Sequence, residues 1–262
     1  MTNNKYKILV LSDMKGATVA LLKNTMGLAK MINGEVEFFH VKKPTEIVER
    51  ESQLSAVREI NEQYFDTDNK IKQVLDPISK TYDIKVKSKH AFGNIKDEIE
   101  SHIKETAPDI IVLGKRKAKA IAFLGDNVTE FVLKKHKGAI MIASEDDSFD
   151  SKRVFSLGVL NEIETSLNKN LAQNLIDVSE VPLKLFKIGG FANADNASDA
   201  TDVKKTVEYV FENNANVIQT ISDYVSKNNI SLLCLDRGQG NSRKASYAKD
   251  AINKVNVSLL VT

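Results

Sequence analysis

The chain has 262 residues, of which 27% are charged and 42% hydrophobic, a composition typical of a soluble globular protein. Its length suits two domains of ordinary size or one large α/β domain. The 37 basic and 35 acidic residues leave a net charge of +2, which gives no electrostatic argument for a nucleic-acid or membrane partner. The single cysteine, Cys234, excludes a disulfide within the chain, and we see no signal peptide or transmembrane run, so we expect a cytoplasmic protein.

In the first half, short apolar runs alternate with amphipathic segments. The run 84–91 alternates apolar and polar residues, which is typical of an edge strand with one wet face. Gly34 is expected to end the first helix, and Pro77 to bend the second. The predicted strands are 8–11, 36–41, 84–91, 110–113 and 139–143, and the predicted helices are 17–33, 55–82, 95–106 and one that starts after Asn127.

This alternation implies a parallel sheet with helices on both faces. In such a doubly wound sheet, ligands bind at the carboxyl ends of the strands, where the strand order reverses. Asp13 follows the first strand, and Gly114 follows the fourth. If these two strands are neighbours, both residues border one crevice.

The segment 109–143 has the geometry that suits phosphate binding. A buried strand ends at Gly114, a basic loop follows, and Gly125-Asp126-Asn127 leads into a new helix. Asn127 and Glu130 have the spacing of a capping box. Gly138 is expected to break this helix before the last strand.

The second half repeats the pattern after a polar linker at 145–152. Its first strand ends at Leu160-Asn161, where an aspartate would be expected. Asp236-Arg237-Gly238 follows its fourth strand without a suitably spaced glycine and serine, so we expect no nucleotide there. The predicted strands are 155–160, 183–188, 206–211, 230–235 and 257–261, and the predicted helices are 163–179, 216–228 and 247–255.

Other chemistry finds little support. The sequence has no P-loop, no dinucleotide-binding glycine motif after the first strand, and no nucleophile elbow. Cys234 lies in an apolar run and is interpreted as a buried small hydrophobe. The histidines lie on a strand, an edge strand and two helix surfaces, without the spacing of a metal site; they are His40, His90, His102 and His136.

Four segments of the first half, in this order, resemble the universal stress protein family in a tandem two-domain form. They are I-L-V-L-S-D, F-F-H-V, F-G-N-I-K-D-E-I followed by P-D-I-I-V-L-G, and F-L-G-D-N-V-T-E-F-V-L. The resemblance implies two tandem doubly wound α/β domains with parallel five-stranded sheets, similar to adenine nucleotide alpha hydrolases, at 1–145 and 153–262. The second domain is expected to be degenerate.

The resemblance also implies ATP or AMP as a ligand of the first domain. Asp13 and Val41 match the positions on the base and ribose side, and Gly114 matches the first glycine of the phosphate motif. Lys117 replaces the second glycine of the phosphate motif. The Asp126 carboxylate, beside the N-terminus of the next helix, would repel a phosphate. Basic side chains could engage phosphates instead. The third glycine is matched by Gly125 and the serine or threonine position by Asp126 or Asn127, while the loop cations are Lys115, Arg116, Lys117 and Lys119.

Three functions remain open. The first is a stress-response or signalling module with at most one adenine-nucleotide site, and the alternative is a protein-interaction module without nucleotide. The third is a nucleotide-cleaving enzyme, which would need a base or metal-holding carboxylates near Gly114; we expect no enzyme. By resemblance, the domains should pack as a pseudo-dimer through 139–143 and 257–261, with a homodimer and unidentified protein partners as further expectations.

Overall fold

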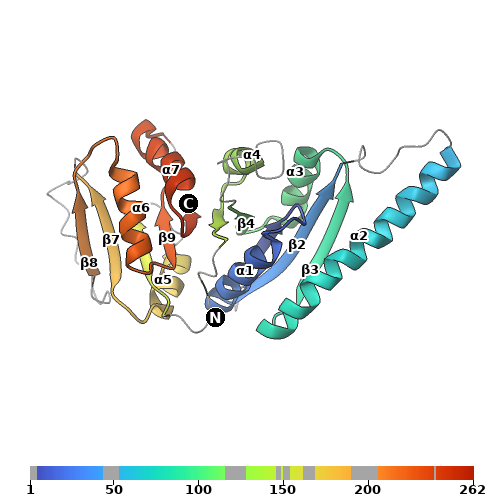
Figure 1. Cartoon of the computed structure of the whole chain (residues 1–262), viewed down its shortest axis with the longest axis horizontal. Helices are drawn as coiled ribbons and strands as arrows, with labels where there is room; N and C mark the ends of the chain where they lie inside the picture. The colour runs from blue at the N-terminus through green and yellow to red at the C-terminus, as the bar shows by residue number, and fades with distance from the viewer. Residues whose placement is uncertain are drawn as a thin grey trace. The chain divides into compact units, whose positions relative to one another are not determined.

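The computed structural model describes residues 5–43, 53–115, 128–145, 149, 154–161, 169–189, 206–238 and 240–262. The chain divides into two compact units, Met1–Gly138 and Ala139–Thr262, which are described separately (Figure 1). The ten strands in the described ranges comprise five in each predicted half, and the alternating α/β order is confirmed. The predicted domain boundaries at 145 and 153 stay a prediction.

In the first unit, the strand order is β3-β2-β1-β4, and all neighbours are parallel. This order confirms the doubly wound arrangement and places β3 at an edge, as the alternating sequence predicts. The elements are β1 (Tyr6–Leu11), α1 (Thr18–Ile32), β2 (Gly34–Lys42), α2 (Gln53–Tyr82), β3 (Val86–Phe92), α3 (Ile95–Thr106), β4 (Ile110–Gly114) and α4 (Val128–Lys135).

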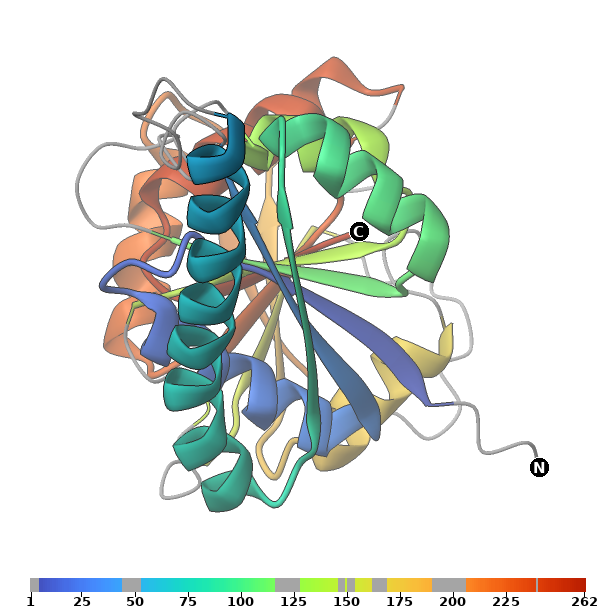
Figure 2. The same cartoon turned by 90° about the vertical axis from the view of Figure 1, so that its right-hand side faces the viewer.

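Helices cover both faces of these strands. α1 packs on β2 and against α2, whereas α3 packs on β2 and against α4. Figure 2 shows α1 and α2 on one side of the strands and α3 on the other. Phe38 of β2 and Leu22 of α1 are completely buried in this core. Burial of one such side chain stabilises the fold by about 1.5–3 kcal/mol.

Helix ends in the first unit follow local chemistry. The Asn94 side chain accepts hydrogen bonds from the Lys96 and Asp97 amides and so caps α3. At the end of α1, Asn33 rather than Gly34 adopts the left-handed conformation, with φ of 55°. Gly34 instead begins β2, where a Cβ would lie 2.5 Å from the Ile8 side chain. α2 runs through Pro77 as one helix.

In the second unit, the strand order is β5-β10-β9-β6-β7-β8, in which β5 and β10 are antiparallel and the other neighbours parallel. Leu260 of β10 pairs with Met141 of β5. Figure 1 shows α6 and α7 side by side over the strands. The elements are β5 (Ala139–Ala143), β6 (Leu157–Leu160), α5 (Lys169–Val178), β7 (Leu183–Ile188), β8 (Thr206–Phe211), α6 (Val217–Lys227), β9 (Leu232–Leu235), α7 (Ser242–Lys254) and β10 (Ser258–Val261).

Two predicted ends need correction. α7 begins at Ser242, not at Tyr247, because the Asn241 side chain accepts hydrogen bonds from the Arg243 and Lys244 amides and caps the helix there. α4 ends at Lys135, so Gly138 does not terminate it. A Cβ at Gly138 would lie 2.5 Å from the Asp109 carbonyl oxygen, so close backbone approach explains this glycine.

No helix within the described ranges is long and apolar enough to cross a membrane.

Candidate functional site

The strand order of the first unit reverses between β1 and β4. These strands are parallel neighbours, and Val10 pairs with Val112. Asp13 and Lys115 each lie three residues beyond that pair, and Gly114 is the buried last residue of β4. The strand adjacency on which the predicted crevice depends is therefore present, at the edge where ligands of doubly wound sheets bind.

The turn after β1 is held by its own side chains. The Lys15 amide donates to Asp13 Oδ1 over 3.1 Å, and the Met14 amide donates to Ser12 Oγ over 3.1 Å. Ser12 Oγ also lies 3.1 Å from Thr18 Oγ1 at the start of α1. Met14 adopts a φ of 60°, which this bonded turn maintains. The Asp13 carboxylate is thus held at the carboxyl-terminal edge of β1, where the crevice is predicted.

The end of β2 is tied to the same turn. His40 Nδ1 donates to the Ser12 carbonyl oxygen over 2.8 Å, and because a carbonyl only accepts, Nδ1 carries the hydrogen. Val41, the next residue, is buried and pairs with Ala91 of β3. His40 therefore has a structural part at this site: it fixes the position of the Ser12 backbone next to Asp13.

Lys115 contributes a half-buried cation directly after β4. Burial lowers the pKa of its ammonium group from 10.5 to about 8. A lysine whose pKa is shifted in this way, at the ligand-binding edge of a doubly wound sheet, is a candidate for a functional site. The sequence reveals the charge of Lys115 but carries no signal for its burial. Sequence alone therefore does not distinguish it from the other cations of the loop.

The rest of the predicted phosphate loop lies outside the described residues. This applies to Lys117, Gly125, Asp126 and Asn127, and to the loop cations Arg116 and Lys119. Their roles stay predictions.

A cavity of about 560 Å³ lies at the opposite, amino-terminal edge of these strands. Four lysines line it, with Lys30 in the last turn of α1 and Lys85 just before β3. The carboxyl ends of α1 and α2 meet this cavity, and their carbonyl groups carry partial negative charge. Lys30 complements the end of α1, and Lys5 and Lys87 pair with Glu35, so the cavity is not an anion site.

The end of β6 in the second unit carries the same backbone hydrogen bond as the end of β1. Leu160 pairs with Phe186, and the Asn161 amide donates to the Phe186 carbonyl, just as the Ser12 amide donates to the Phe39 carbonyl. Asn161 therefore corresponds to Ser12 and not to Asp13, which corrects the sequence comparison. The acidic position is matched by the next residue, Glu162, which lies outside the described residues.

The register on the other side of β6 gives further correspondences. Val159 pairs with Cys234 as Val10 pairs with Val112, so Asp236 stands where the first unit has Gly114. By the same count, Arg237 corresponds to Lys115. Burial lowers the pKa of the Arg237 guanidinium, and the negative charge of Asp236 opposes this shift. Both units thus place a partly buried cation after the fourth strand.

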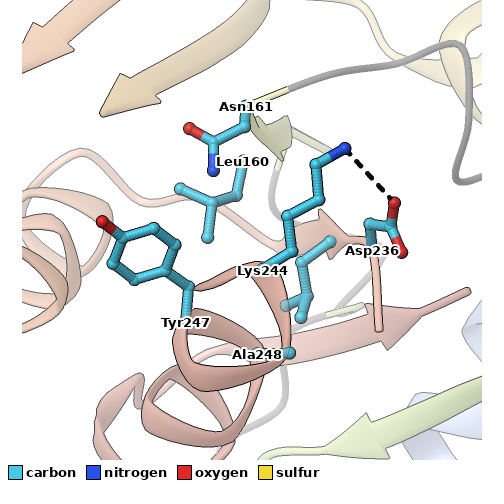
Figure 3. Close-up of a pocket in the computed structure, with 7 residues that line it drawn as sticks. Leu160, Asn161, Asp236, Lys244, Tyr247 and Ala248 are labelled. Carbon is cyan, nitrogen blue, oxygen red and sulfur yellow. Dashed lines mark ion pairs between the residues drawn. The ribbon is translucent and has the colours of Figure 1, made fainter. Parts of the chain in front are cut away.

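The crevice of the second unit is filled by its own side chains (Figure 3). Lys244 extends from α7 toward Asp236, and its Nζ lies 3.7 Å from Asp236 Oδ2. The Gly238 amide donates to Asp236 Oδ1 over 2.7 Å. The remaining cavity is about 10 Å³, the space of a single water molecule. Leu160, Asn161, Tyr247 and Ala248 also line it.

The histidines are more buried than their sequence positions suggest. His102 and His136 are 3% and 6% exposed, so neither lies on a helix surface. His102 stacks on Phe39 with ring centroids 4.1 Å apart. Among the described residues, no group of three or more histidine, cysteine or acidic side chains is placed to hold a metal. The predicted burial of Cys234 is confirmed.

Comparison with known proteins agrees with this architecture. A universal stress protein from Archaeoglobus fulgidus matches with a TM-score of 0.67 and 15% identity, covering 98% of this chain and 97% of that chain. A functionally unknown protein from Pseudomonas aeruginosa matches with a TM-score of 0.56 and 12% identity, covering 98% and 92%. A universal stress protein in complex with cAMP matches with a TM-score of 0.40 and 14% identity, covering 54% and 98%.

At these identities, the first two matches show a shared fold along nearly the whole chain. The comparison with curated proteins gives no match. The family model described as "Universal stress protein family" matches residues 6–143, more than half of the chain. This match covers β1 to β5, including the turn of Asp13 and the end of β4. The chain belongs to the universal stress protein family.

Proposed function

We propose that the first unit binds one adenine nucleotide, ATP or AMP, at the carboxyl edge of β1 and β4, and that the chain acts as a stress-response signalling module. The observation that carries this proposal is the convergence of three features at one switch point. Asp13 is fixed by the Lys15 amide, Gly114 ends the adjacent strand, and Lys115 follows as a half-buried cation.

These groups suit the two chemical ends of a nucleotide. A fixed carboxylate such as Asp13 can accept hydrogen bonds from ribose hydroxyls. The end of β2 at Val41 lies next to the β1 turn through the His40–Ser12 hydrogen bond and offers backbone groups for the base. Lys115 offers positive charge for a phosphate. We therefore give these residues the roles that the family resemblance implies, and all of them lie at one edge of the sheet.

The test is calorimetric titration of the purified chain with ATP and AMP. We expect one site per chain, and Asp13→Ala should weaken binding at least tenfold, because a fixed hydrogen-bond acceptor is lost. Asp76→Ala, which removes an exposed carboxylate from α2, is the matched control and should leave affinity unchanged. Absence of binding at millimolar ligand would overturn the proposal, and unaltered affinity in Asp13→Ala would move the site elsewhere.

The second candidate is an interaction module without nucleotide. It is favoured by the hydroxyl groups of Ser12 and Thr18, because they are hydrogen-bonded to each other within the turn and not directed to a ligand. Asp126 also supplies a competing anion near the helix start in sequence. This candidate would be favoured if the chain bound no nucleotide and captured a protein from its own host. Capture of that protein should then be the same for the Asp13→Ala chain.

The remaining expectations extend the proposal. The two domains are proposed to form a pseudo-dimer, with a homodimer and unidentified proteins as further partners, in the cytoplasm. We propose no catalytic activity: the described residues near Gly114 offer Asp13 as a carboxylate but hold no cluster that suits a metal. Release of phosphate from ATP that is lost in Asp13→Ala would instead support the nucleotide-cleaving alternative.

A further inference from the structure

The second unit carries an unusual group at the place where a doubly wound sheet receives its ligand. By strand register, Asp236 corresponds to Gly114 of the first unit. A glycine at that position lets backbone and ligand approach each other closely, whereas an aspartate brings a carboxylate into the same space. This negative charge lies beside a cavity of only about 10 Å³ and is held there by neighbouring groups.

A backbone amide and an ammonium group lie beside the Asp236 carboxylate. The Gly238 amide donates to Oδ1 over 2.7 Å, and the Lys244 ammonium lies 3.7 Å from Oδ2. The side chains of Lys244 and Asp236 are 18% and 25% exposed, so their attraction is only partly screened by water. Arg237, the next residue, interacts with the same carboxylate electrostatically.

A backbone amide in a glycine turn and a lysine, with an arginine as the next residue, are groups that also bind phosphate. The conformation of the turn brings the Gly238 amide and Lys244 together. Gly238 has a φ of 73°, and a Cβ there would lie 2.1 Å from the Ala245 amide nitrogen. Asn241, whose amide donates to the Gly238 carbonyl, caps α7 and so positions Lys244.

We propose that the second unit retains an anion-binding site of the phosphate class and that Asp236, as a built-in anion, occupies it. The carboxylate neutralises the cations that would otherwise recruit a phosphate, and the Lys244 side chain fills the crevice. On this view the site is closed by an added charge, and its anion-binding groups are still present. The inference concerns the second unit alone and does not rest on nucleotide binding by the first.

In the experiment, inorganic pyrophosphate is titrated into the full chain, and its binding is monitored through the backbone amide resonances by NMR. Asp236→Gly restores the residue type of the first unit, and we expect the Gly238 and Lys244 amide resonances to shift with an affinity at least tenfold tighter than in the unmodified chain. Adding Lys244→Met to this variant should abolish the gain. Asp250→Asn, which removes another carboxylate from α7 that lies 4.0 Å from Lys254, is the matched control and should give no gain.

A folded Asp236→Gly chain whose Gly238 and Lys244 resonances respond no more than those of the unmodified chain would overturn the proposal. A gain that survives Lys244→Met would also overturn it. Asp236→Asn provides a second test, because it keeps the acceptor for the Gly238 amide and removes only the charge. We expect pyrophosphate to raise its midpoint of thermal unfolding by more than that of the unmodified chain, and an equal shift would contradict the idea. The Lys15 amide resonance shows whether pyrophosphate also binds to the first unit, so the two units are distinguished.

Discussion

Lys115 offers the most quantitative test of the site, because its environment makes a prediction with a definite sign. Burial lowers its pKa to about 8 from 10.5, so the folded state disfavours the charged form. The cost is present in full below about pH 8, where the amine is charged in both the folded and unfolded states. It disappears above about pH 10.5, where the amine is neutral in both states. The stability of the first unit should therefore rise with pH through this window.

The magnitude follows from the two pKa values. A gap of about 2.5 corresponds to about 3 kcal/mol as an upper limit. Between about pH 7 and pH 9.5, single-site linkage relieves about 2 kcal/mol of this cost. Lys115→Met removes the titrating group, so its free energy of unfolding should lack this rise. Lys85→Met, at an exposed lysine just before β3, is the matched control and should keep it.

Two measurements address this prediction. NMR titration of chains labelled at the lysine Cε carbons reports the Lys115 midpoint directly, with Lys115→Arg used to assign the resonance. Urea unfolding at the two pH values, followed through amide resonances of the first unit, gives the difference in free energy. A midpoint above about pH 10, or an equal pH dependence in Lys115→Met and the unmodified chain, would refute the reasoning.

Two further predictions concern other parts of the fold. Cys234 is buried and its thiol pKa is raised to about 12, so a thiol reagent should modify it only after denaturant is added; rapid labelling of the native chain would show that β9 opens. Asn94→Ala should lower the stability of the first unit by about 1 kcal/mol through loss of the α3 cap, and Asn94→Asp should restore it; equal urea midpoints for Asn94→Ala and the unmodified chain would contradict this role.

The order and type of the elements were predictable from sequence, because apolar runs and amphipathic periods are strong local signals. β4 and β5 are continuous apolar runs, and each is found within one residue of its predicted limits. The start of α7 was missed because S-R-K-A-S carries little apolar periodicity. The signal that could have placed it is Asn241, a favourable N-cap residue directly before this segment.

The candidate site was less predictable, because it depends on register and burial. The positions of the strand ends in the sequence suggest that Asn161 matches Asp13, whereas pairing with β7 shows that Asn161 corresponds to Ser12. The match of V-L-S-D at 10–13 with V-L-N-E at 159–162 is the sequence signal for this correspondence, and the strand register decides it. His102 likewise occurs in a polar helix, and only the packing of α3 on β2 reveals that its ring is buried against Phe39.

The paired cations Lys115 and Arg237 have a consequence for the history of the chain. They stand at corresponding positions of the two units, as the strand registers show. If the units descend from one duplicated domain, the shortest account gives the ancestor a basic residue at this position. The difference between Gly114 and Asp236 then places a carboxylate directly before this inherited positive charge in the second unit.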